Sequence, residues 1–368
     1  DRSGQVTAGA GVTLAAVHGA AAAAGWAYGV DFASRDRATI GGTVATNAGG
    51  LRVLRHGDTR AQLLGVEAVL GDGSVVSHLG GLAKDNTGYH LPSLLCGSEG
   101  TLGIVTAARL RLVPATDQRV TALLAFGDVE PALVAAALLR RHVRALDAAD
   151  LMLRDGVDLV SRVTARPPPT RSPHAAYLLV EAADQVSPAA ELAAAIATLP
   201  GVAEVVVADD PATARNLWQA REDHAAAVNT LGPPHKFDVT LPAHRLAAFI
   251  DEVPAVVKSA APHARTWMWG HAADGNVHVN VTGLPPDDDR VDDAVLRFVA
   301  GLGGSISAEH GIGTAKRAWL HLNRSPSEID AFRAIKRALD PDGILNPGVL
   351  LPALSYGDAA AGGLGRIR

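Results

Sequence analysis

The chain has 368 residues and a formal net charge of −5, a balance that gives no reason to expect nucleic acid or an anionic membrane surface as a partner. Hydrophobic residues make up 48% of the sequence but aromatic residues only 4%, so the length predicts two domains whose cores consist mainly of Ala, Val and Leu. The single cysteine, Cys96, excludes an internal disulfide and a cysteine-rich zinc site within one chain.

The N-terminal part opens in a strand-like segment. Residues 5–11 predict a strand and turn, and an Ala-rich helix follows from about Thr13 to Ala24. This order is similar to a dinucleotide-binding fingerprint, but Leu14 stands where the third glycine should be, which argues against one. Because the sequence begins at Asp1 within this segment, we expect a missing N-terminal part, and a cytoplasmic location is the default expectation.

The rest of the first unit predicts loops and strands. Residues 38–60 are rich in glycine, residues 63–79 predict a hairpin with its turn at Asp72-Gly73, and residues 108–114 predict a strand. No helix of normal length fits between Gly41 and Pro92.

The second unit begins near Asp117 and alternates strand-like and helical segments. Strands are predicted over residues 120–126, 175–182, 203–209, 236–242, 266–271 and 275–283, and helices over Pro131–His142, Pro188–Thr198, Pro211–Leu231, Ala243–Ser259 and Asp289–Leu302. This rhythm favours an α+β domain with an antiparallel sheet covered on one face by helices. A last helix is predicted over Pro326–Leu339, turns over residues 340–348, and disorder after Pro352.

Two glycine-rich segments are candidates for binding a phosphate-bearing cofactor. The segments GGTVATNAGG and GSEGTLGI combine glycines with the hydroxyls of Thr43, Thr46, Ser98 and Thr101. Backbone N–H groups in such segments can contact anionic oxygens closely. Each segment taken alone is equally consistent with an ordinary tight turn.

A candidate metal site lies in the segment WGHAADGNVHVNV, residues 269–281. Two histidines, His271 and His278, flank a turn at Asp274-Gly275-Asn276, and Glu309 downstream could supply a carboxylate. Two histidines and one carboxylate suit zinc, manganese or iron(II). The alternative is a pair of ordinary histidines without a metal. A functional role is favoured because polar residues lie here within apolar or glycine-rich sequence, namely His278, Asn280, Glu309 and His310.

These motifs resemble the flavin-linked D-2-hydroxy acid dehydrogenases, a family with the vanillyl-alcohol-oxidase (PCMH-type) fold, and the resemblance covers residues from about Gly9 to Leu351. The run ATNAGGLRVLRHG is most similar to the D-2-hydroxyglutarate dehydrogenases. The resemblance implies an FAD-binding domain over residues 1–116, incomplete at its N-terminus. It implies a substrate and metal domain over 117–320, a C-terminal helix and return to the flavin domain over 321–356, and a tail over 357–368.

The resemblance also implies site residues. A divalent metal, with zinc as the first candidate, would be held by His271, His278 and Glu309, with His310 as the catalytic base. Asn280, Arg221 and Lys236 would bind the substrate. FAD would lie along Gly41, Gly42, Thr46, Asn47, Gly49, Gly50, Ser98, Glu99, Gly100, Thr101, Gly103 and Ile104, with Asn346 near its ring.

The implied reaction is oxidation of a D-2-hydroxy acid to a 2-oxo acid, with hydride transfer from C2 to flavin N5. 2-Hydroxyglutarate is the first candidate substrate and D-lactate or glycolate the next. Ala225 stands where D-2-hydroxyglutarate dehydrogenases tend to place a hydroxyl residue, a departure that argues against 2-hydroxyglutarate in particular but not against the class. The electron acceptor would be a quinone, a cytochrome or an electron-transfer flavoprotein, and a homodimer is a reasonable expectation. A flavin-free metal-dependent hydrolase and a catalytically incompetent fragment or binding protein are the alternatives.

Overall fold

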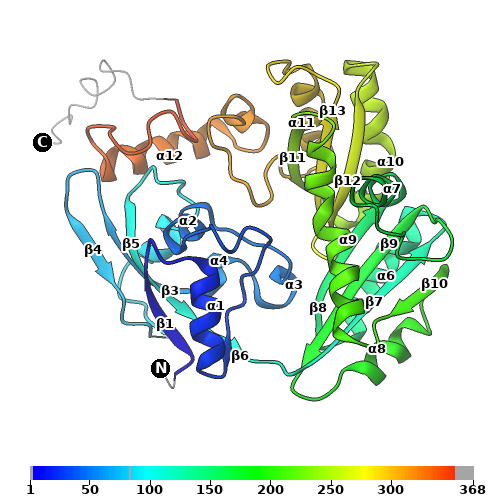
Figure 1. The fold of residues 1–368 in the computed structure, drawn as a ribbon. Coiled ribbons are helices and arrows are strands. Elements are labelled where there is room, and N and C mark those ends of the chain that lie inside the picture. The colour runs from blue at the N-terminus through cyan, green and yellow to red at the C-terminus, as the bar shows by residue number, and fades with distance from the viewer. Residues whose placement is uncertain (1–2, 83, 353–368) are drawn as a thin grey trace, which may run out of the picture. The chain divides into compact units, whose positions relative to one another are not determined.

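The structure is a computed structural model that describes residues 3–82 and 84–352, and the chain divides into two compact units (Figure 1). Unit 1 comprises residues 1–49, 57–114 and 309–368, and unit 2 comprises residues 50–56 and 115–308. Residues 309–320, which the sequence analysis grouped with the substrate domain, therefore belong to unit 1. The expected disordered tail lies outside the described residues.

Unit 1 is built on an antiparallel sheet with the strand order β1-β5-β3-β4. Its strands are β1 (Gln5–Gly9), β3 (Leu63–Val69), β4 (Val75–His78) and β5 (Ile104–Arg111), and a short ribbon pairs β2 (Trp26–Ala27) with β6 (Val113–Pro114). The predicted hairpin is confirmed as β3 and β4, with Gly73 at a φ of +83° in the turn. A left-handed backbone there favours glycine.

Helices bury one face of this sheet, because Ala108 of β5 pairs directly with Val66 of β3 and the two side chains therefore share a face. One core cluster joins Ala108 and Leu110 of β5 to Leu14 of α1 (Leu14–Ala23) and Ile40 of α2 (Ile40–Thr46). A second cluster joins Val66 and Ala68 of β3 to α5 (Leu91–Leu95) and to α12 (Pro326–Leu339). Helix α12, the last within residues 84–352, thus completes the core of the N-terminal unit.

The glycine-rich segment over residues 38–60 contains more helix than the sequence predicts. In addition to α2, it forms the single turns α3 (Val53–His56) and α4 (Thr59–Gln62), of which α3 belongs to unit 2. Side-chain caps stabilise α2 and α4, because the Thr39 hydroxyl accepts from Gly42 N and the Asp58 carboxylate accepts from Ala61 N.

Unit 2 contains an antiparallel sheet with the order β10-β7-β9-β8-β12-β13-β11 (Figure 1). Its strands are β7 (Gln118–Phe126), β8 (Leu146–Leu153), β9 (Ala176–Asp184), β10 (Val202–Val207), β11 (His235–Thr240), β12 (Arg265–His271) and β13 (Asn276–Thr282). Its longer helices are α6 (Val129–His142), α7 (Arg154–Thr164), α8 (Ala189–Ile196), α9 (Pro211–Asn229), α10 (Ala243–Ala260) and α11 (Arg290–Gly301).

Helices cover both faces of the unit 2 sheet, so the expectation of a single covered face is wrong. Successive residues of β9 are buried whichever face they point to, because α6 packs against this strand as well as α9. Leu123 of β7 and Leu179 of β9 pack against Leu217 of α9. The alternate positions, Leu124 and Leu178, are also fully buried.

Strand β8 and helix α7 were not predicted from the sequence, and β8 carries residues that matter for the site. The pairing of β8 with β9 shifts register between Leu146 and Ala148, so a bulge at Asp147 breaks the period-2 pattern. Among the described residues, no helix is both long and apolar enough to cross a bilayer.

Candidate active site and metal centre

One face of unit 2 gathers polar side chains from β11, β12 and β13, which lie side by side in the sheet (Figure 1). In the observed register Lys236 pairs with Asn280, Asp238 with His278 and Thr240 with Asn276. The alternation predicted for this segment is confirmed, because Val277, Val279 and Val281 point to the opposite face and are buried.

His271 and Arg221 are held by a carboxylate that the sequence analysis did not include. His271 of β12 pairs in register with Asp150 of β8, and its Nδ1 lies 2.8 Å from Asp150 Oδ1. Arg221 of α9 places Nε 2.7 Å from Asp150 Oδ2, in an ion pair that is not aligned as a hydrogen bond. Asp150 is fully buried, and His271 and Arg221 are nearly so.

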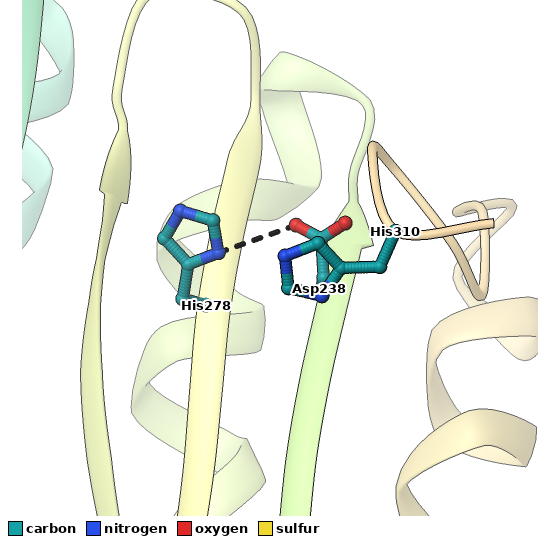
Figure 2. Close-up of side chains that lie close together, drawn as sticks. All are labelled: Asp238, His278 and His310. Carbon is teal, nitrogen blue, oxygen red and sulfur yellow. Dashed lines mark ion pairs between the residues drawn. The ribbon is translucent and has the colours of Figure 1, made fainter. Parts of the chain in front are cut away.

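His278 has a second carboxylate beside it, shown in Figure 2 on the neighbouring strand. Its Nδ1 lies 3.2 Å from Asp238 Oδ1, and Asn276 Nδ2 donates to the same oxygen over 2.8 Å. The rings of His271 and His278 meet edge to face with their centroids 5.5 Å apart.

Burial and charge both act on the ionisation of these groups. Burial would raise the pKa of Asp150, but the adjacent His271 and Arg221 outweigh it and keep that pKa below its ordinary value. Burial is the main cause that lowers the pKa of His278, partly opposed by its hydrogen bond to Asp238. A neutral imidazole is the form that binds a metal.

The donor set fits a divalent cation. Both histidines direct Nδ1 to a carboxylate, so Nε2 is the nitrogen that would bind a metal, and Asp238 and His278 also offer their own ligand atoms to one. Asn276 Oδ1 is buried beside them without a hydrogen-bond partner. A buried acceptor of this kind is commonly satisfied by an ion or a water.

The other predicted substrate and metal residues are placed as follows. Asn280 is buried and Lys236 is exposed, and both lie on the same face as His278. Glu309 is half-buried and His310 is exposed, in the segment that continues from Ala308. Ala308 N donates to Asp238 O over 3.0 Å, so the chain that leads to Glu309 is attached to the strand carrying Asp238.

The two predicted flavin segments are joined within unit 1. Glu99 N donates to Ala45 O over 2.7 Å, and Gly97 N donates to Val44 O over 2.9 Å. Gly41, Gly42 and Thr46 lie in α2, Asn47 is its left-handed C-cap, Ile104 begins β5, and Gly49, Ser98, Gly100, Thr101 and Gly103 lie in the adjoining turns. Gly50 is the first residue of the short segment that belongs to unit 2.

Glu99 connects these segments to the C-terminal part of unit 1. Its carboxylate accepts from the backbone N–H groups of Ile312 and Gly313 over 2.8 and 2.7 Å. Asn346 Nδ2 donates to Glu99 O over 2.5 Å, and both Glu99 and Asn346 have a positive φ, 54° and 40° respectively. Non-glycine residues with such backbone angles are uncommon and tend to mark functional loops.

Two glycines of these segments stand where the backbone leaves little choice of residue. A Cβ at Gly41 would lie 2.7 Å from Ala10 Cβ, so no larger residue fits there. Gly100 has a φ of +72°, and a Cβ there would lie 3.6 Å from Asn346 Nδ2. Contacts within unit 1 thus require glycine at position 41, and the positive φ favours it at position 100. Both glycines leave the backbone bare of a side chain, as contact with a flavin phosphate would require.

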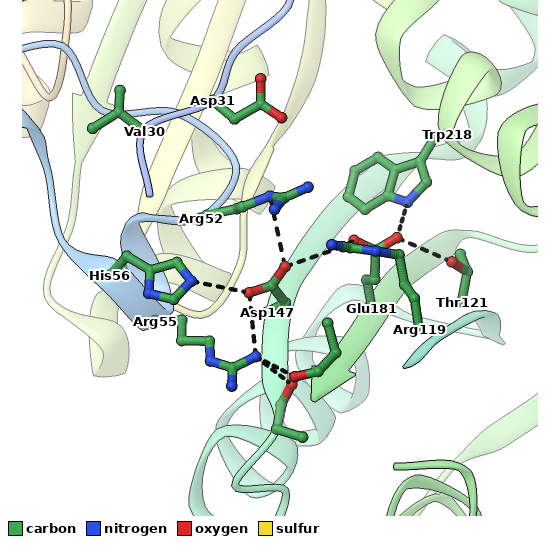
Figure 3. Close-up of polar contacts among 12 residues, drawn as sticks. Val30, Asp31, Arg52, Arg55, His56, Arg119, Thr121, Asp147, Glu181 and Trp218 are labelled. Atoms are coloured by element: carbon green, nitrogen blue, oxygen red, sulfur yellow. Dashed lines mark hydrogen bonds and ion pairs between the residues drawn. The ribbon is translucent and has the colours of Figure 1, made fainter. Parts of the chain in front are cut away.

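A separate network in unit 2 surrounds Asp147, as Figure 3 shows. Arg119 Nη1 lies 3.1 Å from Asp147 Oδ2, and Arg52, Arg55 and His56 place nitrogens 3.5 to 3.6 Å from its oxygens. Burial opposes ionisation, but His56, Arg52 and Arg119 together lower the pKa of Asp147 to about 2. This network attaches residues 50–56 to β8.

Sequence reasoning missed Asp147, Asp150 and Asp238. A usable signal was present, because each is a carboxylate within a short apolar segment, LDAADLML or KFDVTLP. Acidic residues in such segments are rarely buried unless they are paired.

Comparison with known proteins identifies the class. A profile for the C-terminal domain of FAD linked oxidases matches residues 116–350, and one for an FAD binding domain matches residues 1–78. The chain belongs to the FAD-linked oxidase family and is an FAD-dependent oxidoreductase. The predicted PCMH-type fold is confirmed by a solved 4-ethylphenol oxidase from Gulosibacter chungangensis, with a TM-score of 0.70 and 17% identity over 95% of this chain and 77% of that one. An alkyldihydroxyacetonephosphate synthase gives a TM-score of 0.70 at 15% identity, over 94% and 64% of the two chains.

Curated relatives narrow the family further. D-2-hydroxyglutarate dehydrogenase of Xanthomonas citri pv. viticola is 37% identical over 94% of this chain and 75% of its own length. The mitochondrial D-2-hydroxyglutarate dehydrogenase of Bos taurus is 34% identical over 96% of this chain and 66% of its own length. The chain thus spans two thirds to three quarters of these relatives. The predictions of FAD as cofactor and of an oxidoreductase related to 2-hydroxy acid dehydrogenases are confirmed.

Proposed function

We propose that this protein oxidises a D-2-hydroxy acid to the 2-oxo acid, with D-2-hydroxyglutarate as the first candidate substrate. The observation that carries the proposal is the shared face of β11, β12 and β13, where two carboxylate-paired histidines lie beside Asn280 and Lys236. The relatives named D-2-hydroxyglutarate dehydrogenase support the choice of substrate.

In this proposal the residues of unit 2 bind the substrate and a divalent metal. His271 and His278 serve as metal ligands, with zinc as the first candidate ion and Glu309 as the third ligand. Asp238 is the alternative carboxylate ligand, because it lies directly beside His278. Arg221 and Lys236 supply positive charge for the two carboxylates of a dicarboxylic hydroxy acid, and Asn280 donates from its amide.

The chemistry is shared between the cofactors and the chain. When bound, FAD accepts a hydride and the metal acidifies the α-hydroxyl. His310 would accept the hydroxyl proton, since a neutral imidazole is well suited to that role near pH 7. A quinone, a cytochrome or an electron-transfer flavoprotein would serve as the electron acceptor of the enzyme.

Anaerobic flavin bleaching tests this function. The purified protein is mixed with D- and L-2-hydroxyglutarate, D-lactate or glycolate, with and without a chelator, and flavin absorbance is followed. We expect the fastest bleaching with D-2-hydroxyglutarate and its loss with the chelator. Faster bleaching with D-lactate or glycolate would make that acid the substrate in place of D-2-hydroxyglutarate. A colourless, flavin-free protein would overturn the proposal.

The metal assignment is tested separately with Glu309→Ala. We expect this variant to lose bound zinc and turnover, whereas Glu252→Ala, at an exposed position of α10, should keep both. Unchanged zinc content in Glu309→Ala would remove Glu309 from the ligand set and leave Asp238 as the carboxylate ligand.

A further inference from the structure

The feature that leads beyond the proposed reaction is the arrangement of carboxylates around the histidine hairpin. Asp150 of β8 stands directly across from His271 of β12, and Asp238 of β11 stands directly across from His278 of β13. In both pairs the contact is made through Nδ1 of the histidine, at 2.8 and 3.2 Å. The same geometry therefore occurs twice, on the two strands that flank the hairpin.

A carboxylate in this position fixes the tautomer of a metal-binding histidine. With its proton on Nδ1 and donated to the carboxylate, the ring presents Nε2 as the ligand atom. The contact also holds the ring orientation and increases its basicity. Asp150 is fully buried, so solvent does not weaken this interaction.

Asp150 differs from Asp238 because it has a second cationic partner. Arg221 Nε lies 2.7 Å from Asp150 Oδ2, the oxygen that is not in contact with His271. Arg221 is only 7% exposed, and a buried guanidinium requires a counter-charge. A contact through Nε leaves other N–H donors of the guanidinium to meet an anionic ligand.

The negative charge of Asp150 lies between two positive groups, Arg221 and any metal bound at His271. A divalent cation at His271 and the cation of Arg221 repel each other at short range in a buried site. The carboxylate between His271 and Arg221 offsets this repulsion. Without it, the substrate-binding arginine would oppose metal binding.

We propose that Asp150 is the positioning residue of this site, orienting the metal ligand His271 through one oxygen and the substrate-binding Arg221 through the other. This inference rests on the proposed function, and it adds a coupling between the metal site and the binding of the substrate carboxylate. Asp150 touches neither metal nor substrate. Its effect on both passes through the two residues that it holds.

The test combines two measurements on the full, metal-free chain. Titration with Zn²⁺ against a competing chromophoric chelator compares wild type with Asp150→Asn and Asp147→Asn. We expect the zinc affinity of Asp150→Asn to fall by about 10–100-fold. Asp147→Asn is the matched control, because it removes a buried carboxylate from the same strand without contact to His271 or Arg221, and its zinc affinity should stay within about 3-fold of wild type.

The second measurement needs no variant, so it tests the role of Asp150 even if Asp150→Asn fails to fold. Two-dimensional ¹⁵N NMR of histidine-labelled wild type, without metal, should show His271 protonated at Nδ1. Protonation at Nε2, or equal zinc affinities of wild type and Asp150→Asn, would overturn the inference. If both results are as expected but no hydroxy acid bleaches the flavin, the proposed function fails and the role of Asp150 stands. A wild-type chain that binds no Zn²⁺ would overturn both.

Discussion

Replacing Asp147 with asparagine should weaken unit 2 by an amount that depends on pH. The asparagine keeps the size and one acceptor of the side chain but removes the negative charge that Arg52, Arg55, His56 and Arg119 surround. Lowering the pKa of this carboxyl from 3.8 to about 2 corresponds to about 2 kcal/mol of stabilisation of the folded state at pH 7. Asp147 is only 2% exposed, so solvent screening does not reduce this figure substantially.

The sign of the pH dependence follows from the lowered pKa. The stabilisation is fully present above pH 3.8, the ordinary value, and is lost as the pH falls through about 2. At pH 3 about half of it remains, so the difference in unfolding free energy between wild type and Asp147→Asn should shrink to about 1 kcal/mol. Below pH 2 the two proteins should unfold alike.

Urea unfolding followed by tryptophan fluorescence measures this difference. Replacing Trp26 and Trp319 by phenylalanine in all proteins leaves tryptophans only in unit 2. The exposed Asp287, changed to asparagine, provides a control that should stay within about 0.5 kcal/mol of wild type at every pH. A difference for Asp147→Asn that is the same at pH 7 and pH 3 would refute the reasoning, because it would not arise from the charge.

Three further substitutions test other parts of the structure. Lys336→Met should destabilise unit 1 by about 3–5 kcal/mol in urea unfolding, because the buried Lys336 pairs with Asp340 and donates to the carbonyls of Thr101 and Leu345. A loss below about 1 kcal/mol would contradict this expectation. Gly41→Ala should lower the flavin content of the purified protein, since the added Cβ would lie 2.7 Å from Ala10 Cβ. Full flavin content would contradict this expectation, because the segment would then accommodate the methyl group without loss of flavin binding. Lys236→Met should raise the KM for D-2-hydroxyglutarate by about 10–100-fold, because a charged contact to the substrate is lost. The control Lys258→Met, at an exposed helix position, should leave this KM unchanged. An unchanged KM in Lys236→Met as well would show that Lys236 does not bind the substrate.

Local patterns were sufficient to predict the histidine hairpin. The turn residues and the alternating valines of residues 275–281 define a strand with one apolar and one polar face, and β13 has this form. The antiparallel sheet and the hairpin at Asp72-Gly73 were predictable for the same reason, because they depend on residues close together in sequence.

The partners of the histidines were not predictable in this way. Asp150 and His271 lie 121 positions apart in sequence and meet only through the register of β8 with β12. The bulge at Asp147 also hides β8 from a search for regular alternation. Arg221 was identified as a charged residue on a helix, but its burial against Asp150 depends on how α9 packs on the sheet.

The interrupted course of the chain has a consequence for synthesis on the ribosome. Unit 2 is complete once residue 308 has been made, whereas unit 1 needs residues from 309 onward, including α12, to close its core. At about 5–20 residues per second, the first strands of unit 1 wait many seconds for these partners. Leu95 and Leu102, which pack against α12 in the finished protein, therefore remain without that cover in the nascent chain, and chaperone binding during translation should concentrate on this N-terminal unit.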